Sequence, residues 1–184
     1  MTTPYAQALD ELGAVMARLD DHAVEHACRL VEEADRIVLH GLGREGLQVR
    51  GFCMRLFHMG LNVSMVGDMT TPHLGPGDLF VVSSGPGALA TAGELMKIAR
   101  GAGAAVLLIT AQPEAALRRH ADHLLVIPAQ TMADDQGATA SRILPMGSAF
   151  EGALFVVFEV MVAKLKEMTG ITAEDMRARH TNME

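Results

Sequence analysis

The sequence predicts an α/β fold in which helices cover both faces of a parallel sheet, as in a three-layer α-β-α sandwich. Two observations predict it: five short runs rich in Val, Ile and Leu recur along the chain, and stretches with helical character separate them. Continuous apolar runs are typical of parallel strands buried on both faces, and their alternation with helices is typical of βαβ units. With 184 residues, of which 49% are hydrophobic, we expect one domain with a substantial core.

The elements follow one another in a regular order. We expect N-terminal helices over about 4–34, with helical sequence at 7–34 in one or two pieces. The parallel core, about 36–128, has predicted strands at 36–40, 62–66, 78–82, 104–110 and 123–128 and predicted helices at 46–59, 88–100 and 113–120. The polar stretch 130–141 is predicted to be a surface loop, and the last helix, at 148–168, lies in a C-terminal segment, about 145–184, that ends in a charged tail.

Composition excludes several classes of function. The net charge of -7 disfavours a nucleic-acid surface, which needs clustered Lys and Arg. The apolar run in the last predicted helix is interrupted by Glu159 and is too short to span a bilayer, and the first residues do not read as a signal peptide. Cys28 and Cys53 are isolated, so neither a disulfide framework nor a zinc site is expected. We therefore expect a cytoplasmic protein with no nucleic-acid or membrane partner.

An anion site is predicted where the third strand runs into a helix. Ser83, Ser84, Gly85 and Gly87 form this turn, and the helix after it would direct its first N–H groups at a ligand. The glycines permit backbone angles and close approaches that a side chain would block. Because ligands bind at the carboxyl ends of the strands in open α/β sheets, the loops after the first four strands are expected to converge on this turn.

A second glycine-rich turn allows a different interpretation. Gly41, Gly43 and Gly46 have the spacing of the dinucleotide fingerprint, and Asp68 follows about twenty residues later. The two charged residues between the second and third glycines argue against this reading, since the pyrophosphate turn normally carries small or apolar residues. A tight turn that simply needs glycine is the structural alternative.

Six segments spread over nearly the whole chain carry a resemblance to a known family. They are GLGREG at 41–46, GFCMRLFHMG at 51–60, GDMTTPHLGPGDL at 67–79, SSGPG at 83–87, LPMGSAFEGALFV at 144–156 and ITAEDMRARHTNME at 171–184. Together they resemble the sugar isomerase (SIS) family of phosphosugar-binding domains, and within it the 6-phospho-3-hexuloisomerases. The resemblance implies a doubly wound, flavodoxin-like fold with five parallel strands and an oligomer of two or four chains. It also implies isomerisation between 3-hexulose 6-phosphate and fructose 6-phosphate without metal or organic cofactor.

The resemblance assigns two residues to catalysis. Glu151, near the start of the last predicted helix, matches the family's proposed catalytic glutamate, which moves a proton between adjacent carbons through an enediol. A helix N-terminus by itself lowers the pKa of such a carboxyl group, so desolvation by substrate is expected to oppose that shift. Tails in this family reach a neighbouring subunit, so His180 is expected to complete the neighbour's site as an acid.

The phosphate turn departs from the family pattern. The family usually has Ser-Gly-Ser-Gly-Glu-Thr where this chain has Ser-Gly-Pro-Gly-Ala-Leu at 84–89, so two hydroxyls and a carboxylate are absent. Glu45 stands where the family usually has a serine, and its carboxylate would repel a phosphate dianion unless it is turned away or paired with Arg44. The remaining candidates for substrate and phosphate binding are Gly43, Arg44, Ser83, Ser84, Gly85, Gly87, Thr70 and Thr71.

Three functions remain as hypotheses. The first is a phosphosugar isomerase with Glu151 as base, and the second is a non-catalytic sugar-phosphate binding domain, which the altered turn suggests. The third is dinucleotide binding through GLGREG at 41–46. No metal is expected, because His22 and His26, one helical turn apart, have no further ligand at matching spacing.

Overall fold

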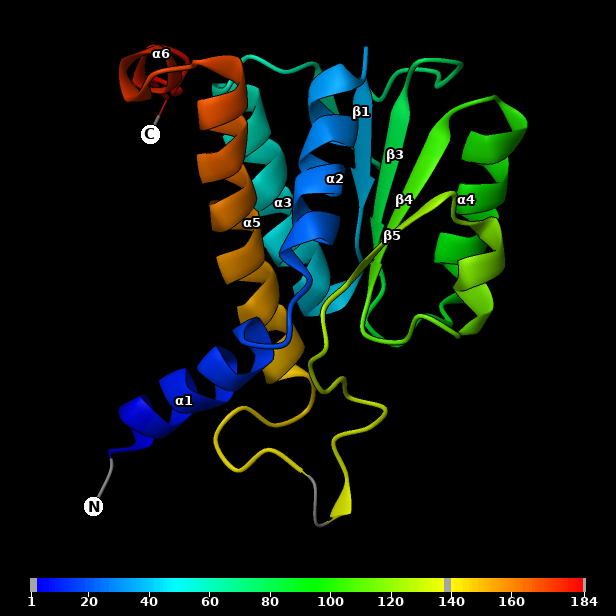
Figure 1. Cartoon of the computed structure of the whole chain (residues 1–184). Coiled ribbons are helices and arrows are strands. Elements are labelled where there is room, and N and C mark those ends of the chain that lie inside the picture. Colours follow the sequence, from blue (N-terminus) through cyan, green and yellow to red (C-terminus); the bar gives the residue numbers. More distant parts are fainter. Residues whose placement is uncertain (1–2, 138–139, 184) are drawn as a thin grey trace.

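The structure, a computed structural model, describes residues 3–137 and 140–183. Within these ranges, five strands form one all-parallel sheet in the order β2-β1-β3-β4-β5 (Figure 1). The strands are β1 (Ile37–His40), β2 (Val63–Met65), β3 (Leu79–Ser83), β4 (Ala105–Thr110) and β5 (His123–Val126). This is the flavodoxin-like strand order, so the predicted five-stranded parallel sheet is confirmed.

The helices lie largely where the sequence pattern places them. The N-terminal region forms two helices, α1 (Pro4–Met16) and α2 (Asp21–Glu33). After them come α3 (Gly43–His58), which begins three residues before its predicted start, α4 (Ala90–Gly101) and the long α5 (Ser148–Thr169). The sequence pattern does not predict the short α6 (Ala173–Ala178), which begins with a capping box formed by Thr172 and Asp175.

The helix predicted over 113–120 is reduced to a single 3-10 turn, η1 (Ala116–His120). Ala115 before it has a ψ of 170°, which is extended backbone, so helical geometry cannot begin any earlier. The apolar and basic residues of this stretch favour a helix, but only five of them adopt one.

Both faces of the sheet are covered, which explains the unbroken apolar runs. Ile37 and Leu39 of β1 join the core that β1 shares with α2, α3 and α5, whereas Val38 between them joins the core under α4. Successive side chains of a strand point to opposite faces, so a central strand between two helical layers needs an apolar residue at every position. The predicted α-β-α layering is thereby confirmed (Figure 1).

Stacked aromatic rings hold α5 against α3. The rings of Phe52 on α3 and Phe158 on α5 have centroids 4.3 Å apart and an interplanar angle of 5°. Both side chains are almost fully buried. Because α3 and α5 each begin at the carboxyl edge of the sheet, this contact also sets how their first turns face each other.

Phe52→Ala is expected to lower the free energy of unfolding by about 3–5 kcal/mol, because it removes a buried ring and leaves a cavity. Equilibrium unfolding in urea measures this change. Ile98→Ala is the control, since Ile98 on α4 is 68% exposed, and it is expected to shift the same quantity by less than about 0.5 kcal/mol. A loss below about 1 kcal/mol for Phe52→Ala would mean that the ring contact does not hold the two helices together.

Candidate active site

Three helices begin at the carboxyl edge of the sheet, and none of them has a side-chain N-cap. The residues before α3, α4 and α5 are Leu42, Leu89 and Gly147, and none provides a capping hydrogen bond from its side chain. By contrast, a threonine or aspartate side chain caps each of α1, α2 and α6. Uncapped N–H groups and the positive ends of three helix dipoles make this edge receptive to an anion.

A pocket of about 370 Å³ lies between these helix ends. Its walls come from the first turns of α3 and α5, the turn after β3 and the connection between β5 and α5: Leu42, Gly43, Arg44, Glu45, Pro86, Leu89, Thr131, Met132, Met146, Gly147, Phe150 and Glu151. It therefore contains the predicted base, Glu151, and two of the predicted binding residues, Gly43 and Arg44. The volume suits a small polar metabolite.

A sharp backbone turn positions Glu151 at this pocket. Met146 has a φ of 57° and Gly147 a φ of 86°, so the chain passes through the left-handed region immediately before α5. A Cβ on Gly147 would lie 3.1 Å from the backbone nitrogen of Met132, so only glycine fits without displacement. Left-handed backbone at a residue other than glycine is strained, and such strain gathers at functional sites. The turn brings Glu151 into the first turn of α5, with its side chain 16% exposed.

Arg44 reaches from α3 to the start of α5. Its Nε lies 3.0 Å from Oε2 of Glu151, and its Nη1 donates to Oγ of Ser148 over 3.0 Å. Its Nη2 donates to the backbone carbonyl of Met146. The guanidinium thus joins the entry turn of α5 to its catalytic candidate and fixes the orientation of the carboxylate.

Burial raises the pKa of Glu151 above its ordinary value of 4.5. The charge of Arg44 opposes this shift, and the nearby carboxylate of Glu45 adds to it. Desolvation by the protein itself therefore outweighs the effects that lower the pKa, before any substrate binds. A carboxylate with a raised pKa is a stronger base, which suits proton abstraction from carbon.

Glu45 fills the turn after β3. The hydroxyl of Ser83 donates to Oε2 of Glu45 over 2.7 Å, and the N–H of Gly85 lies 3.0 and 3.1 Å from the two carboxylate oxygens. Glu45 is therefore neither turned away from the turn nor paired with Arg44, the two arrangements expected to spare a phosphate. Burial raises its pKa, although the bonds from Ser83 and Gly85 act in the opposite direction. Two donors that were expected to bind an anion already bind a carboxylate of the protein.

The glycines and the second serine of this turn complete the arrangement. A Cβ on Gly85 would lie 3.1 Å from Oε1 of Glu45 and 3.0 Å from the ring of Phe150, so glycine admits the carboxylate. Gly87 has a φ of 65°, and its N–H bonds back to the carbonyl of Ser84. The Ser84 hydroxyl is buried and has no hydrogen-bond partner among the described residues. A buried hydroxyl without a partner is costly, and Ser84, although predicted to bind the ligand, does not line the pocket.

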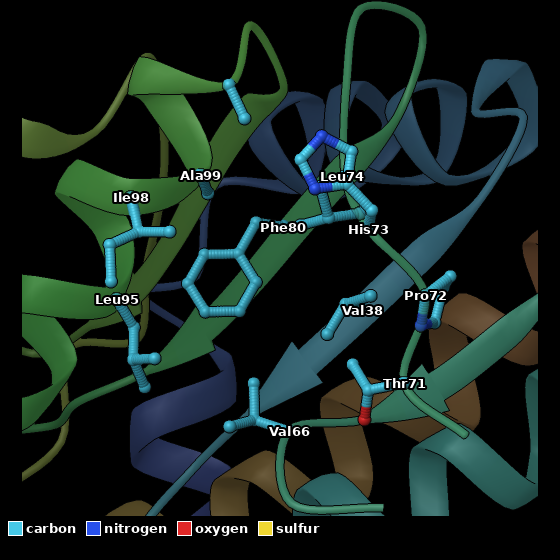
Figure 2. A pocket seen from close by; sticks show the side chains of 11 residues that line it. Val38, Val66, Thr71, Pro72, His73, Leu74, Phe80, Leu95, Ile98 and Ala99 are labelled. Carbon is cyan, nitrogen blue, oxygen red and sulfur yellow. The ribbon is translucent and has the colours of Figure 1, made fainter. Parts of the chain in front are cut away.

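Thr70 and Thr71 lie outside the pocket of Glu151. The Thr71 hydroxyl is 2.7 Å from the carbonyl oxygens of both Met65 and Asp68, so local backbone satisfies it. Thr71 lines a separate, mainly apolar pocket of about 240 Å³ beside α4, which Figure 2 shows with Phe80 at its floor. Thr70 is exposed in the preceding turn. Neither threonine lines the pocket that holds Arg44 and Glu151.

His180 lies far from Glu151 of the same chain. Its ring centroid is 5.1 Å from that of His58, at the C-terminal end of α3, where α6 also packs (Figure 1). Glu45 and His58 are 13 residues apart on α3, which corresponds to about 20 Å along the helix axis. The structure therefore brings together Gly43, Arg44 and Glu151, but not His180.

The first glycine-rich turn is packed on itself. A Cβ on Gly46 would lie 2.6 Å from the carbonyl oxygen of Gly41, so this glycine allows α3 to start directly against the end of β1. Asp68 accepts a hydrogen bond from the N–H of Met65 over 3.1 Å and so stabilises its own turn. Packing accounts for these residues without a dinucleotide.

The role of Glu45 and the contributions of Thr131 and Met132 to the site are not predicted by the sequence patterns. Glu45 was expected to disturb a phosphate, not to replace it, and Thr131 and Met132 belong to a stretch expected to be only a surface loop. Thr131 is 2% exposed and donates to Asp134 over 2.9 Å, so part of this polar stretch is buried and ordered against the site. Length was the available signal, because connections this long without regular structure often line binding sites.

Neither a metal centre nor a membrane span was found in the part of the chain that the structure describes. Within residues 3–137 and 140–183, no three His, Cys, Asp or Glu side chains are placed to hold a metal ion. No helix in those ranges has the length and apolar character needed to cross a membrane.

Comparison with known proteins places this chain in one family. The family model of the SIS domain matches residues 30–155. The chain is 37% identical, over all of its length and 92% of the relative's, to a 3-hexulose-6-phosphate isomerase of Mycobacterium gastri. It is 32% identical, over all of its length and 99% of the relative's, to a 3-hexulose-6-phosphate isomerase of Bacillus subtilis.

A solved structure has the same fold. It is the crystal structure of a hypothetical protein of Methanococcus jannaschii, from which a molecular function of 3-hexulose-6-phosphate isomerase was inferred. The two structures superpose with a TM-score of 0.82 over 96% of this chain and 97% of the other, at 22% identity. At that identity the likeness supports the fold alone.

Proposed function

Because this chain belongs to the SIS domain family, we propose that it is a sugar-phosphate isomerase that interconverts 3-hexulose 6-phosphate and fructose 6-phosphate through an enediol. Two relatives that match its whole length are named for this activity. The observation that carries the proposal is the pairing of Arg44 with a largely buried Glu151 in a pocket at the carboxyl edge of the sheet, where open α/β folds bind their ligands.

The reaction needs one base for the carbon-bound proton and one group that moves a proton between the oxygens. The two sugars differ in whether the carbonyl is on C3 or on C2. Glu151 takes the proton from C2 of the 3-hexulose, which leaves a 2,3-enediolate. The protonated carboxyl group exchanges with solvent and then delivers a proton to C3, while the proton on O2 moves to O3. The Arg44 guanidinium, 3.0 Å from the base, keeps the carboxylate oriented and stabilises negative charge on the enediolate oxygens.

We place the phosphate group at the uncapped ends of the helices that meet at the pocket. Leu42 and Leu89 leave the first N–H groups of α3 and α4 without side-chain partners, and Gly147 does the same for α5. These donors do not depend on the hydroxyls that the turn has lost relative to the family. The turn after β3 contributes further donors only when Glu45 releases them.

We further propose that the protein acts as a homodimer or homotetramer in which a neighbouring chain completes each site. Large apolar side chains are exposed on α3 and α5: Leu47, Met54, Phe57, Phe155 and Val160. Exposed apolar groups that gather on packed helices favour an interface with another protein surface. His180 then serves as the acid in a neighbour's site. Within its own chain it lies beside His58, at the opposite end of α3 from the pocket that contains Glu151.

We place the activity in the cytoplasm. Burial raises the pKa of both Cys28 and Cys53 to about 11, so these free cysteines stay protonated at neutral pH. Unreactive thiols without a disulfide partner suit a reducing compartment.

Glu45 favours a second candidate function, a sugar-phosphate binding domain without catalysis. Its carboxylate takes donors from the turn that the family uses for phosphate, which would weaken substrate binding and turnover. One experiment separates the two candidates: purified protein is incubated with 3-hexulose 6-phosphate and, separately, with pentose phosphates, and the products are followed by NMR. Isomerase activity predicts fructose 6-phosphate from the first. Thermal stabilisation by these sugars without any conversion would replace the isomerase with the binding domain.

The acidic limb of the pH profile is expected to lie above the ordinary glutamate pKa of 4.5. Glu151 must be ionised to act as a base, and burial raises its pKa, so activity is lost as the pH falls through that raised value. The measurement is kcat/KM against pH, which reports groups of the free enzyme. A limb at or below 4.5 would contradict the assignment.

A further inference from the structure

We infer that Glu45 is a specificity-determining residue that competes with the substrate's phosphate for the turn after β3. The inference rests on the proposed function, because it assumes that a phosphorylated sugar enters the neighbouring pocket. It concerns a residue that the reaction itself does not use. What points to it is the placement of a carboxylate on the donors of Ser83 and Gly85.

The bonds of Glu45 are those that an anion would make. One hydroxyl and one backbone N–H, from Ser83 and Gly85, point at its two oxygens over 2.7 to 3.1 Å. Oxygens of a phosphate require the same kind of donors, and each donor serves one strong acceptor at a time. A dianion beside an ionised carboxylate is also repelled by it, strongly so in a partly buried site. The carboxylate and a phosphate therefore cannot share the turn.

Glu45 is placed so that it can leave the turn without unfolding it. It lies in the first turn of α3 and lines the pocket of about 370 Å³, so its side chain has space on the substrate side. The turn keeps its own backbone bonds, from Gly87 to Ser84 and from Ala111 to the carbonyl of Gly85. Departure of the carboxylate would free the Ser83 hydroxyl and the Gly85 N–H for the phosphate.

Competition of this kind makes selectivity depend on charge. A ligand that binds only through its sugar hydroxyls is indifferent to Glu45, whereas a phosphorylated ligand gains the donors of the turn only by displacing Glu45. Removing the charge should therefore strengthen the binding of phosphate compounds alone. A purely structural role for Glu45 predicts the opposite, since loss of its bonds would loosen the turn and weaken every ligand.

Isothermal calorimetry with fructose 6-phosphate and with inorganic phosphate tests the inference. The variants are Glu45→Gln, which keeps the size of the side chain, and Glu45→Ser, which also removes its bulk. Glu33→Gln is the matched control, because it changes the net charge equally at an exposed position on α2. We expect both Glu45 variants to bind fructose 6-phosphate at least tenfold more tightly than the unaltered protein, and Glu33→Gln to bind it equally well.

Equal or weaker binding by both Glu45 variants, or no binding by any of the proteins, would overturn the inference. If Glu45→Ser does not fold, Glu45→Gln still decides the question. Turnover of 3-hexulose 6-phosphate is measured separately on the same samples. If the Glu45 variants bind more tightly but no protein turns over the sugar, the proposed isomerase activity is wrong and the inference about Glu45 stands. If the proteins turn over the sugar but the Glu45 variants do not bind more tightly, the isomerase proposal stands and the inference about Glu45 is wrong.

Discussion

Glu151→Gln is expected to lower kcat for the isomerisation by about 10²–10⁴-fold, because the amide cannot accept the proton that the carboxylate removes from carbon. The substitution keeps the size of the side chain and one oxygen that can still accept a bond from Arg44. Affinity for fructose 6-phosphate and the urea midpoint should therefore stay close to those of the unaltered protein. Initial rates and calorimetry on the same preparations give both quantities.

Glu159→Gln is the matched control for this prediction. Glu159 lies on the same helix, α5, and also pairs with an arginine of α3, Arg55, over 3.1 Å, but it lies outside the pocket. Its loss is expected to leave kcat unchanged. If Glu151→Gln retained more than about a tenth of the activity, the loss would be smaller than the contribution of a general base. Another residue would then have to be the base.

Arg44→Met is expected to lower kcat/KM by about 10²-fold, since the base and the entry turn of α5 lose the group that orients them. It should also move the acidic limb of the pH profile to higher pH. The sign follows from the charges: Arg44 lowers the pKa of Glu151, so removing it lets burial and Glu45 raise that pKa further. The measurement is kcat/KM against pH for the two proteins.

Arg55→Met provides the comparison for Arg44→Met. It breaks the other arginine bridge between α3 and α5, which lies away from the pocket, and so should leave the limb in place. An unchanged limb in Arg44→Met, or an equal shift in both variants, would show that Arg44 does not control the ionisation of Glu151.

The sheet could be predicted because a strand that is buried on both faces has apolar residues at successive positions of the sequence. At Ile37, Val38 and Leu39 every position faces a helical layer, so the strand reads as an unbroken apolar run. The last helix was equally clear, since its predicted start coincides with Ser148. The predicted helix over 113–120 largely failed, because its propensity did not reveal the extended backbone at Ala115.

The candidate site could be predicted only in part. Glu151 and Arg44 follow from motifs near the starts of two helices, but their 3.0 Å contact depends on how α3 packs against α5. The bond between Glu45 and Gly85 joins residues 40 positions apart, and no local pattern tells whether a carboxylate reaches such a turn. His180 shows the same limit, because its position beside His58 depends on how α6 packs against α3.

Exchange of hydrogen with solvent tests the central claim most directly. Fructose 6-phosphate is incubated in D₂O with the unaltered protein and with Glu151→Gln, and the sugar protons are followed by NMR. If Glu151 forms the 2,3-enediol, the proton on C3 is replaced by deuterium with the unaltered protein and persists with the variant. Two results would contradict Glu151 as the solvent-exchanging base. In the first, the unaltered protein converts the sugar to the 3-hexulose but the proton on C3 is retained; in the second, both proteins exchange this proton equally.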